Sequence, residues 1–300
     1  NYMVFLVFRI LTAVVSGTVV SISMTYAEDV ASIPEHIPGV IAGVFSGFSV
    51  ASVVGVPIAS TITHVFGWRA AFITIFVATL ALLALLFVKL QRQNRLKAGS
   101  ILEQFKLFLD KRISIGCAIV FLAGASTYCF YTYLTPIFQQ ELHIPDSMLS
   151  VALLIFGIAA ITSNVSSGQV ANKTGIRLLP LIYVIQTVCL LLLPIATHNL
   201  ISGGLVLFIL GVMMYLLNSP LQMHFLKIAT REHPACVNLA SSLISVFFNF
   251  GIAAGSAMGG VIVKYAGLRF VGIGGAVPGI GAIICAVILL QIMKSDADIR

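Results

Sequence analysis

The chain has 300 residues, of which 59% are hydrophobic and only 9% are charged, and its mean hydropathy is +1.07. A soluble domain of this length cannot bury so much apolar surface, so the composition excludes one. It predicts an all-α integral membrane protein, in which helices satisfy every backbone polar group inside the bilayer. The net charge of +7 requires no nucleic acid partner, because the basic residues follow the membrane topology described below.

Nine apolar runs are long enough to cross a hydrocarbon core about 30 Å thick as helices of roughly 20 residues. They fall near residues 3–26, 40–64, 68–89, 113–138, 146–171, 177–197, 201–224, 236–264 and 269–293. The first run begins at once, without the layout of a signal peptide. The one long polar interruption is 89–112. Within it, the apolar spacing in 99–111 predicts a short helix on the membrane surface.

Basic residues in alternate loops predict the orientation, because Lys and Arg are retained on the cytoplasmic side. If the 89–112 loop is cytoplasmic, that side carries thirteen Lys and Arg residues and the other side carries four. The thirteen include Lys173 and Arg177, and the four include Arg9 and Arg69. We therefore expect a multi-pass protein of the bacterial inner membrane, with the 89–112 loop and the C-terminus in the cytoplasm.

The sequence nearly repeats itself at a distance of 200 residues. Gly55 precedes Gly67-Trp68-Arg69 by twelve residues, and Gly255 precedes Gly267-Leu268-Arg269 by the same number. This pairs 40–89 with 236–293 and 3–26 with 201–224, and leaves the three helices between 113 and 197 without earlier partners. The repeat predicts a parent of two six-helix halves whose first three helices are absent here. A natural nine-helix protein is the alternative.

This duplication divides the chain into three parts. Residues 1–90 would be the C-terminal half of the N-terminal six-helix bundle, 91–112 the cytoplasmic central loop with its interfacial helix, and 113–300 the C-terminal six-helix bundle. A glycine series on one helix face occurs in both copies: Gly43, Gly47 and Gly55, followed by Pro57, and then Gly251, Gly255 and Gly259. Such a face allows close helix packing. It indicates either simple tight packing or a surface that rocks between inward-facing and outward-facing states.

Three motifs resemble those of the major facilitator superfamily. Gly55-Val56-Pro57 through Gly67-Trp68-Arg69 resembles the fifth-helix motif of its drug and sugar antiporters. Arg9-Ile10-Leu11-Thr12 with Gly17 resembles the fourth-helix motif, with Thr12 and Ala13 where Gln and Gly are common. The stretch from Gly168 through Lys173 and Gly175 to Arg177 resembles the second copy of the loop motif, although Asn172 replaces its acid and Ile176 a base.

Within that superfamily the chain is similar to bacterial sugar efflux transporters of the arabinose-exporter type. The resemblance rests on Ser219-Pro220-Leu221-Gln222-Met223, on Phe248 through Gly255, and on Gly275-Ala276-Val277-Pro278. It implies export of a small solute, a sugar or sugar-like molecule, by proton antiport with alternating access. It also implies that Arg9 faces the central cavity near an acid; snorkelling of Arg9 to the membrane surface is the alternative. Drug or purine export and a non-transporting remnant are alternative functions.

A sugar-like substrate needs uncharged hydrogen-bonding groups and aromatic faces in the cavity. The mid-span candidates are Tyr128, Tyr131, Asn164, Asn218, Gln222 and Asn249. Asn218 and Gln222 are four residues apart and so share one helical face. Each candidate has an alternative role, because polar residues in membrane spans also hold neighbouring helices together.

The sequence shows no carboxylate in the middle of a span, although proton-driven export needs a group that loads and unloads protons. His64, His143 and His224 all lie near span ends. We expect the proton carrier in the absent helices, or coupling by another group. The five cysteines are scattered singly and indicate neither a metal site nor a disulfide framework. We expect a monomeric transporter rather than an enzyme, whose partners are its solute, protons and lipid, with no cofactor and no nucleic acid.

Overall fold

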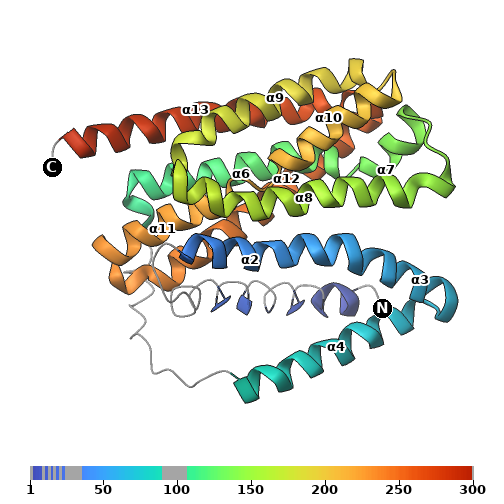
Figure 1. Cartoon of the computed structure of the whole chain (residues 1–300), viewed down its shortest axis with the longest axis horizontal. Helices are drawn as coiled ribbons and strands as arrows, with labels where there is room; N and C mark the ends of the chain where they lie inside the picture. Colours follow the sequence, from blue (N-terminus) through green and yellow to red (C-terminus); the bar gives the residue numbers. More distant parts are fainter. Residues whose placement is uncertain are drawn as a thin grey trace.

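The computed structural model describes residues 36–89 and 107–298, together with 3–8, 11, 12, 15, 18, 19, 22 and 23. All regular structure in these residues is helical. Figure 1 shows the long helices lying roughly side by side. The end of α4, the start of α6 and the ends of α11 and α13 lie at the same end of the bundle. We call this end the loop end, since the central loop joins α4 to α6.

The first described part of the chain is a helix interrupted by a π-helical turn. It consists of α2 (Ile37–Val50), η2 (Ala51–Gly55) and α3 (Val56–Phe66), and α4 (Trp68–Lys89) follows. The sequence predicts one continuous helix over 40–64. Pro57, the second residue of α3, has no N–H to continue the regular hydrogen bonding, and the helix widens just before it. Gly67 then reverses the chain with a φ of 84°, where its N–H donates to the carbonyl of Thr63 at 3.0 Å.

The rest of the chain forms a bundle of long helices. Its elements are η3 (Leu107–Leu109), α6 (Lys111–Tyr131), α7 (Leu134–Pro136), η4 (Ile137–Glu141), α8 (Asp146–Lys173), η5 (Gly175–Leu178), α9 (Leu179–Ala196), α10 (Leu200–Met213), α11 (Asn218–Glu232), η6 (Pro234–Cys236), α12 (Val237–Tyr265), η7 (Leu268–Phe270) and α13 (Val271–Asp298). The helices predicted over 146–171, 177–197, 236–264 and 269–293 agree with α8, α9, α12 and α13.

Two predicted boundaries were wrong. The helix predicted over 113–138 ends at Tyr131, because Pro136 lacks an N–H and its ring would clash with the carbonyl of Thr132. The helix predicted over 201–224 is broken at 214–217 and continues to Glu232. Of the surface helix predicted over 99–111, only the turn Leu107–Leu109 lies among the described residues.

Seven segments of the described residues are long and apolar enough to cross a membrane. They correspond to α4, α6, α8, η5 with α9, α10 with α11, α12, and η7 with α13. Nearly half of the predicted first span lies outside the described residues, and the predicted second span is divided by η2. The number nine therefore stays a prediction, as does the division of the chain at 91–112.

Helix α6 lies at the centre of the bundle. It packs against α12 and α13, and α13 packs against α9. Helix α2 packs on α8 and α11, so it joins the first part of the chain to the second. By contrast, the span of α4 buries none of its residues against the rest of the described chain, although its mean hydropathy is 2.8. A helix that is apolar on every side requires lipid or other helices around it.

The two glycine series have different surroundings. On α12, a Cβ added at Gly259 would lie 2.6 Å from the carbonyl oxygen of Cys129 on α6. Gly251 and Gly255 face the backbone of α6 even more closely. Around Gly43, Gly47 and Gly55 a Cβ would meet no atom of the described chain within 4 Å. Close helix packing is therefore present at the second series, and the structure does not show it at the first.

Candidate functional site

A break in one membrane span lies near the middle of the bundle. Helix α10 ends at Met213 and α11 begins at Asn218, within an apolar segment that runs from Leu200 to Glu232. Pro220 explains the break, because it cannot donate to the carbonyl of Leu216 and its ring crowds that carbonyl. The N–H of Tyr215, freed at the break, donates to Ser163 Oγ of α8 at 2.9 Å. A neighbouring helix thus satisfies a backbone group that lipid could not.

A buried polar network surrounds this break. Asn218 Nδ2 donates to Asn164 Oδ1 at 2.8 Å, and Asn164 Nδ2 donates to the carbonyl of Phe45 on α2 at 3.2 Å. Three residues further along α8 and one residue further along α11, the hydroxyls of Ser167 and Ser219 are 2.8 Å apart. The network therefore connects α2, α8 and α11. Two of the six predicted cavity residues meet here in one hydrogen bond.

Gln222 and Asn249 lie in different surroundings. Gln222 is fully buried and its Nε2 donates to the carbonyl of Ser241 on α12 at 3.2 Å, whereas its Oε1 has no partner. Asn249 is exposed, and its Nδ2 donates to the carbonyl of Ser245 in its own helix at 2.7 Å. Gln222 therefore links α11 to α12, whereas Asn249 is exposed and bonds within α12.

An aromatic cluster adjoins the network and shares helix α8 with it. Tyr128 and Tyr131 of α6 pack edge to face with ring centroids 5.2 Å apart. Tyr128 also contacts Phe248 of α12 at 5.8 Å, and Tyr131 contacts Phe156 of α8 at 5.6 Å. Tyr215, in the break, lies 6.1 Å from Phe248. Both predicted tyrosines therefore belong to one cluster, which adjoins the broken helix through Tyr215.

The cluster and the network together offer uncharged chemistry. Ring faces can pack against the C–H surface of a solute, and tyrosine hydroxyls and asparagine amides can exchange hydrogen bonds with it. All of the described residues in both groups are neutral. The arrangement is therefore suited to a small neutral solute with hydroxyl groups rather than to an ion.

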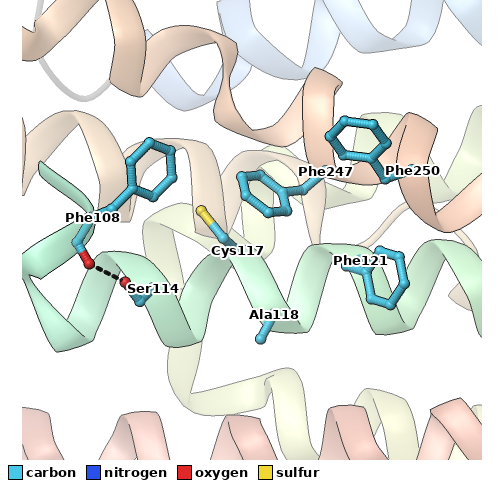
Figure 2. Close-up of a pocket in the computed structure, with 7 residues that line it drawn as sticks. All are labelled: Phe108, Ser114, Cys117, Ala118, Phe121, Phe247 and Phe250. Carbon is cyan, nitrogen blue, oxygen red and sulfur yellow. Dashed lines mark hydrogen bonds between the residues drawn. The ribbon is translucent and has the colours of Figure 1, made fainter. Parts of the chain in front are cut away.

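An apolar cavity of about 580 Å³ lies between α6 and α12. Figure 2 shows Phe247 and Phe250 on α12 above the helix that carries Ser114, Cys117, Ala118 and Phe121, with Phe108 at its start. The only hydrogen bond drawn joins Ser114 Oγ to the carbonyl of Phe108. None of the six predicted cavity residues lines this space.

The remaining predicted residues mark turns and helix ends. Arg9 and Gly17 lie outside the described residues. Gly55 is exposed at the end of η2, and Arg69 lies over the ring of Trp68, 5.0 Å from its centroid. The other motif residues also lie at turns or helix ends, except Gly168, which is buried within α8. Pro57 lies in the first turn of α3, and Gly67 and Gly175 have φ values of 84° and 56°. Lys173 is exposed at the end of α8, and Arg177 is exposed in η5.

Charged residues gather at the loop end of the bundle. Arg112 donates to Asp110 through Nη2 at 2.5 Å and pairs with Glu232, the last residue of α11, through Nη1 and Nη2. Burial would raise the pKa of Asp110, but hydrogen bonds from the side chain and backbone of Arg112, with the charges of Arg112 and His233, hold that pKa below its ordinary value. We call Asp110, Arg112 and Glu232 the Arg112 clamp.

Sequence reasoning missed Ser163, Phe156 and Tyr215 as neighbours of the site. Ser163 stands beside Asn164, so an uninterrupted polar pair in an apolar helix was an available signal. Tyr215 lies five residues before Pro220, and a proline in a span marks a possible break. The clamp had no such signal, since Arg112 and Glu232 are 120 residues apart in sequence.

Comparisons with known proteins agree with this architecture. A family model described as Major Facilitator Superfamily matches residues 1–238. The uncharacterized MFS-type transporter YtbD of Bacillus subtilis (strain 168) is 30% identical over 280 residues, which cover 92% of this chain and 70% of that protein. The inner membrane transport protein YdhP of Escherichia coli (strain K12) is 25% identical over 296 residues, covering 98% and 73%.

A third relative is named for its substrate. The probable sugar efflux transporter of Pasteurella multocida (strain Pm70) is 27% identical over 231 residues, which cover 77% of this chain and 56% of that protein. The family model spans most of the chain, and YtbD aligns over nearly all of it. The helical structure, its apolar spans and these matches lead to one assignment. The chain belongs to the Major Facilitator Superfamily, a family of multi-pass membrane transporters.

Proposed function

We propose that this transporter exports a small neutral solute, a sugar or sugar-like molecule, across the bacterial inner membrane by proton antiport. The observation that carries the proposal is the hydrogen-bonded pair Asn164 and Asn218, which lies at a broken helix beside an aromatic cluster. Discontinuous helices near the middle of the membrane often form substrate sites in secondary transporters. The name of the Pasteurella relative, probable sugar efflux transporter, supports the same substrate class.

Within this proposal Tyr128 and Tyr131 supply ring faces, and Asn164 and Asn218 supply hydrogen bonds. In the conformation described, both amides are almost fully buried, with 1% and 4% of their surface exposed. Substrate must therefore enter when α8 and α11 separate on one side, which exchanges the amide pair for bonds to the solute. Gln222 and Asn249 are further candidates, and Asn249 reaches a solute only from the exposed surface of α12.

The proposed orientation places the loop end of the bundle in the cytoplasm. Lys173, Arg177, Lys227 and Arg231 all fall in loops or helix ends on the same side of the membrane as the central loop, by the alternation of spans. The proposed localisation in the bacterial inner membrane agrees with the printed name of YdhP, an inner membrane transport protein. Function as a monomer is part of the same proposal.

The decisive experiment uses inverted membrane vesicles that carry the chain together with any upstream helices of its gene. Collapse of a preformed proton gradient is followed while pentoses, thiogalactosides and lipophilic cations are added in turn. We expect sugars to collapse the gradient, and Asn218→Ala to reduce that response. Vesicles with Thr162→Ala serve as a matched control, because that exposed hydroxyl on α8 bonds within its own helix. Collapse by cations alone would contradict the sugar assignment.

A drug or purine exporter is the second candidate. The apolar cavity between α6 and α12, with its phenylalanine lining, favours a lipophilic compound over a hydroxylated one. In that case Phe121→Ala and Phe247→Ala would weaken the response to lipophilic cations, while Asn218→Ala would leave it unchanged. The two candidates therefore predict opposite results in the same vesicles.

Arg9 is the last residue of the proposed mechanism, and its role in proton coupling rests on its sequence motif alone. We expect Arg9→Ala to abolish gradient-driven efflux without affecting membrane insertion, because a cation facing the cavity would tune proton loading. The measurement is the same gradient collapse, with the amount of protein in the membrane as the control. Unchanged transport would assign Arg9 to the membrane surface.

A further inference from the structure

His224 is a buried histidine that the proposed transport mechanism does not yet use. It lies on α11, two turns before Glu232, and 7% of its surface is exposed. Its Nε2 atom is buried without a hydrogen-bond partner. Leaving a buried polar atom unpaired is costly, so such an atom in a folded protein calls for an explanation.

The other described histidines have ordinary surroundings. His36, His143 and His198 are exposed, and His233 is half-buried at the C-terminal end of α11. Among the histidine side chains that the structure describes, His224 alone is buried. Histidine is also the side chain whose charge changes most readily near neutral pH. A buried imidazole with one unpaired nitrogen is therefore a candidate for binding a proton.

The groups around His224 belong to the Arg112 clamp. The backbone of Arg112 lies within hydrogen-bonding reach of the imidazole. The charged groups that act on it are Arg112 and Asp110 at the start of α6, and Lys227 on its own helix. Helical spacing places His224 and Glu232 on one face of α11, eight residues or about 12 Å apart. The clamp thus lies between the imidazole and the loop end of the bundle.

In the closed clamp both carboxylates are engaged by Arg112. A positive charge on His224 then has no free carboxylate beside it, and a charge buried without a partner is expensive. If the side chain of Arg112 leaves both carboxylates and turns toward water, Asp110 becomes available to an imidazolium. The cavity of Figure 2 lies close to the clamp, because its lining includes Phe108 and Ser114, which flank Asp110 and Arg112 in the sequence.

We propose that His224 is a proton-binding site of this transporter, which releases its proton to the loop end when the Arg112 clamp opens. The lone pair of the imidazole accepts a proton from water on the opposite side of the membrane to give an imidazolium. The imidazolium returns the proton to water at the loop end when the clamp opens. This inference rests on the proposed antiport. It supplies a titrating group within the described residues, where the sequence alone offered none in mid-span.

The first test measures proton binding without transport. The full chain, labelled with ¹³C and ¹⁵N at its six histidines, is placed in lipid nanodiscs and titrated between about pH 5 and 9, the range in which histidine changes charge. His224→Gln identifies the His224 resonance. We expect its titration midpoint to move in Glu232→Gln, which opens the clamp, and to stay unchanged in Glu141→Gln, at the other end of the bundle.

A His224 resonance that shows no titration in either the wild type or Glu232→Gln would overturn the proposal. So would equal titration curves in these two proteins, because the clamp would then not control the site. If His224→Gln does not insert into the membrane, replacing the other five histidines one at a time identifies the His224 signal by elimination. The wild-type and Glu232→Gln spectra then decide the question without that variant.

The second test separates this inference from the antiport itself. In vesicles, we expect His224→Gln to lose proton movement coupled to the solute, while exchange of solute for solute continues. Proton-coupled export that is unchanged in His224→Gln would overturn the role of His224 and leave the antiport standing. If no solute moves protons in the wild type but the clamp still controls titration, the antiport fails and the proton-binding site remains.

Discussion

Gly55 and Gly255 occupy equivalent places in the duplicated sequence but have different neighbours. A Cβ at Gly255 would collide with the backbone of Ala125 on α6, whereas a Cβ at Gly55 would meet no described atom within 4 Å. Backbone atoms cannot move aside as the end of a flexible side chain can. The same residue in the same motif therefore has a packing role that the structure shows in only one copy.

We expect Gly255→Ala to destabilise the protein by about 1–3 kcal/mol, because the added methyl group overpacks the contact between α6 and α12. Gly55→Ala is the matched control and should change stability by no more than about 0.5 kcal/mol. Thermal unfolding of both variants in the same detergent measures the difference. Equal melting temperatures for the two variants would contradict the close contact at Gly255.

Asp110 gives a second prediction for a single residue, this time in its dependence on pH. Its folded-state pKa is lowered, so its ionised form stabilises the fold above its unfolded pKa of about 3.9, and that stabilisation is lost as pH falls through the folded value. We expect the stability difference between wild type and Asp110→Asn to be constant from about pH 8 to 5 and to shrink below about pH 4. A difference that grows toward low pH would contradict the ion pair.

At the scale of elements, the break between α10 and α11 explains why polar residues cluster there. Pro220 interrupts the backbone bonding, Ser163 satisfies the freed N–H of Tyr215, and Asn164 joins Asn218. Each of these side chains holds α8 against α11 in the conformation described. A residue that holds two helices together in one state can bind a solute in another, so the predicted cavity role and the packing role are compatible.

A double-mutant cycle on Asn164→Ala and Asn218→Ala separates these two roles. We expect the pair to couple by roughly 0.6–2 kcal/mol in thermal unfolding, the range for hydrogen bonds between membrane helices. Asn249→Ala, whose bond lies within α12, should couple with neither. Additive losses of stability for the first pair would show that the bond between the amides contributes nothing to the folded state.

Much of the architecture follows from sequence, for reasons that particular residues illustrate. Composition predicts that the chain is a membrane protein. Runs such as Trp68–Lys89 are apolar on every side, so a membrane-spanning helix can be predicted for them without knowledge of their neighbours. The break at 214–217 could not be predicted in the same way, because the apolar run continues through it. Pairing of Arg112 with Glu232 depends on tertiary contact across 120 residues. Local patterns contain no information on such contacts.

For the whole molecule, the central question is which end faces the cytoplasm. Single cysteines can report this orientation. Lys173→Cys and Arg177→Cys place a thiol at the turn between α8 and η5, and Glu141→Cys places one at the opposite end of the bundle. We expect a membrane-impermeant thiol reagent added to intact cells to label only Glu141→Cys. Four of the five native cysteines are buried, which keeps the background low. Labelling of Lys173→Cys from outside would reverse the proposed orientation.

The glycine face of α12 also limits how the protein can move. Its residues lie so close to the backbone of α6 that sliding one helix past the other would drive carbonyl oxygens into Cα atoms. These two helices should therefore travel as a single rigid body. Spin labels on α6 and α12 would keep a constant separation through a transport cycle, and any change of distance should appear instead between α2 and α8, where the contact includes the side chain of Asn164.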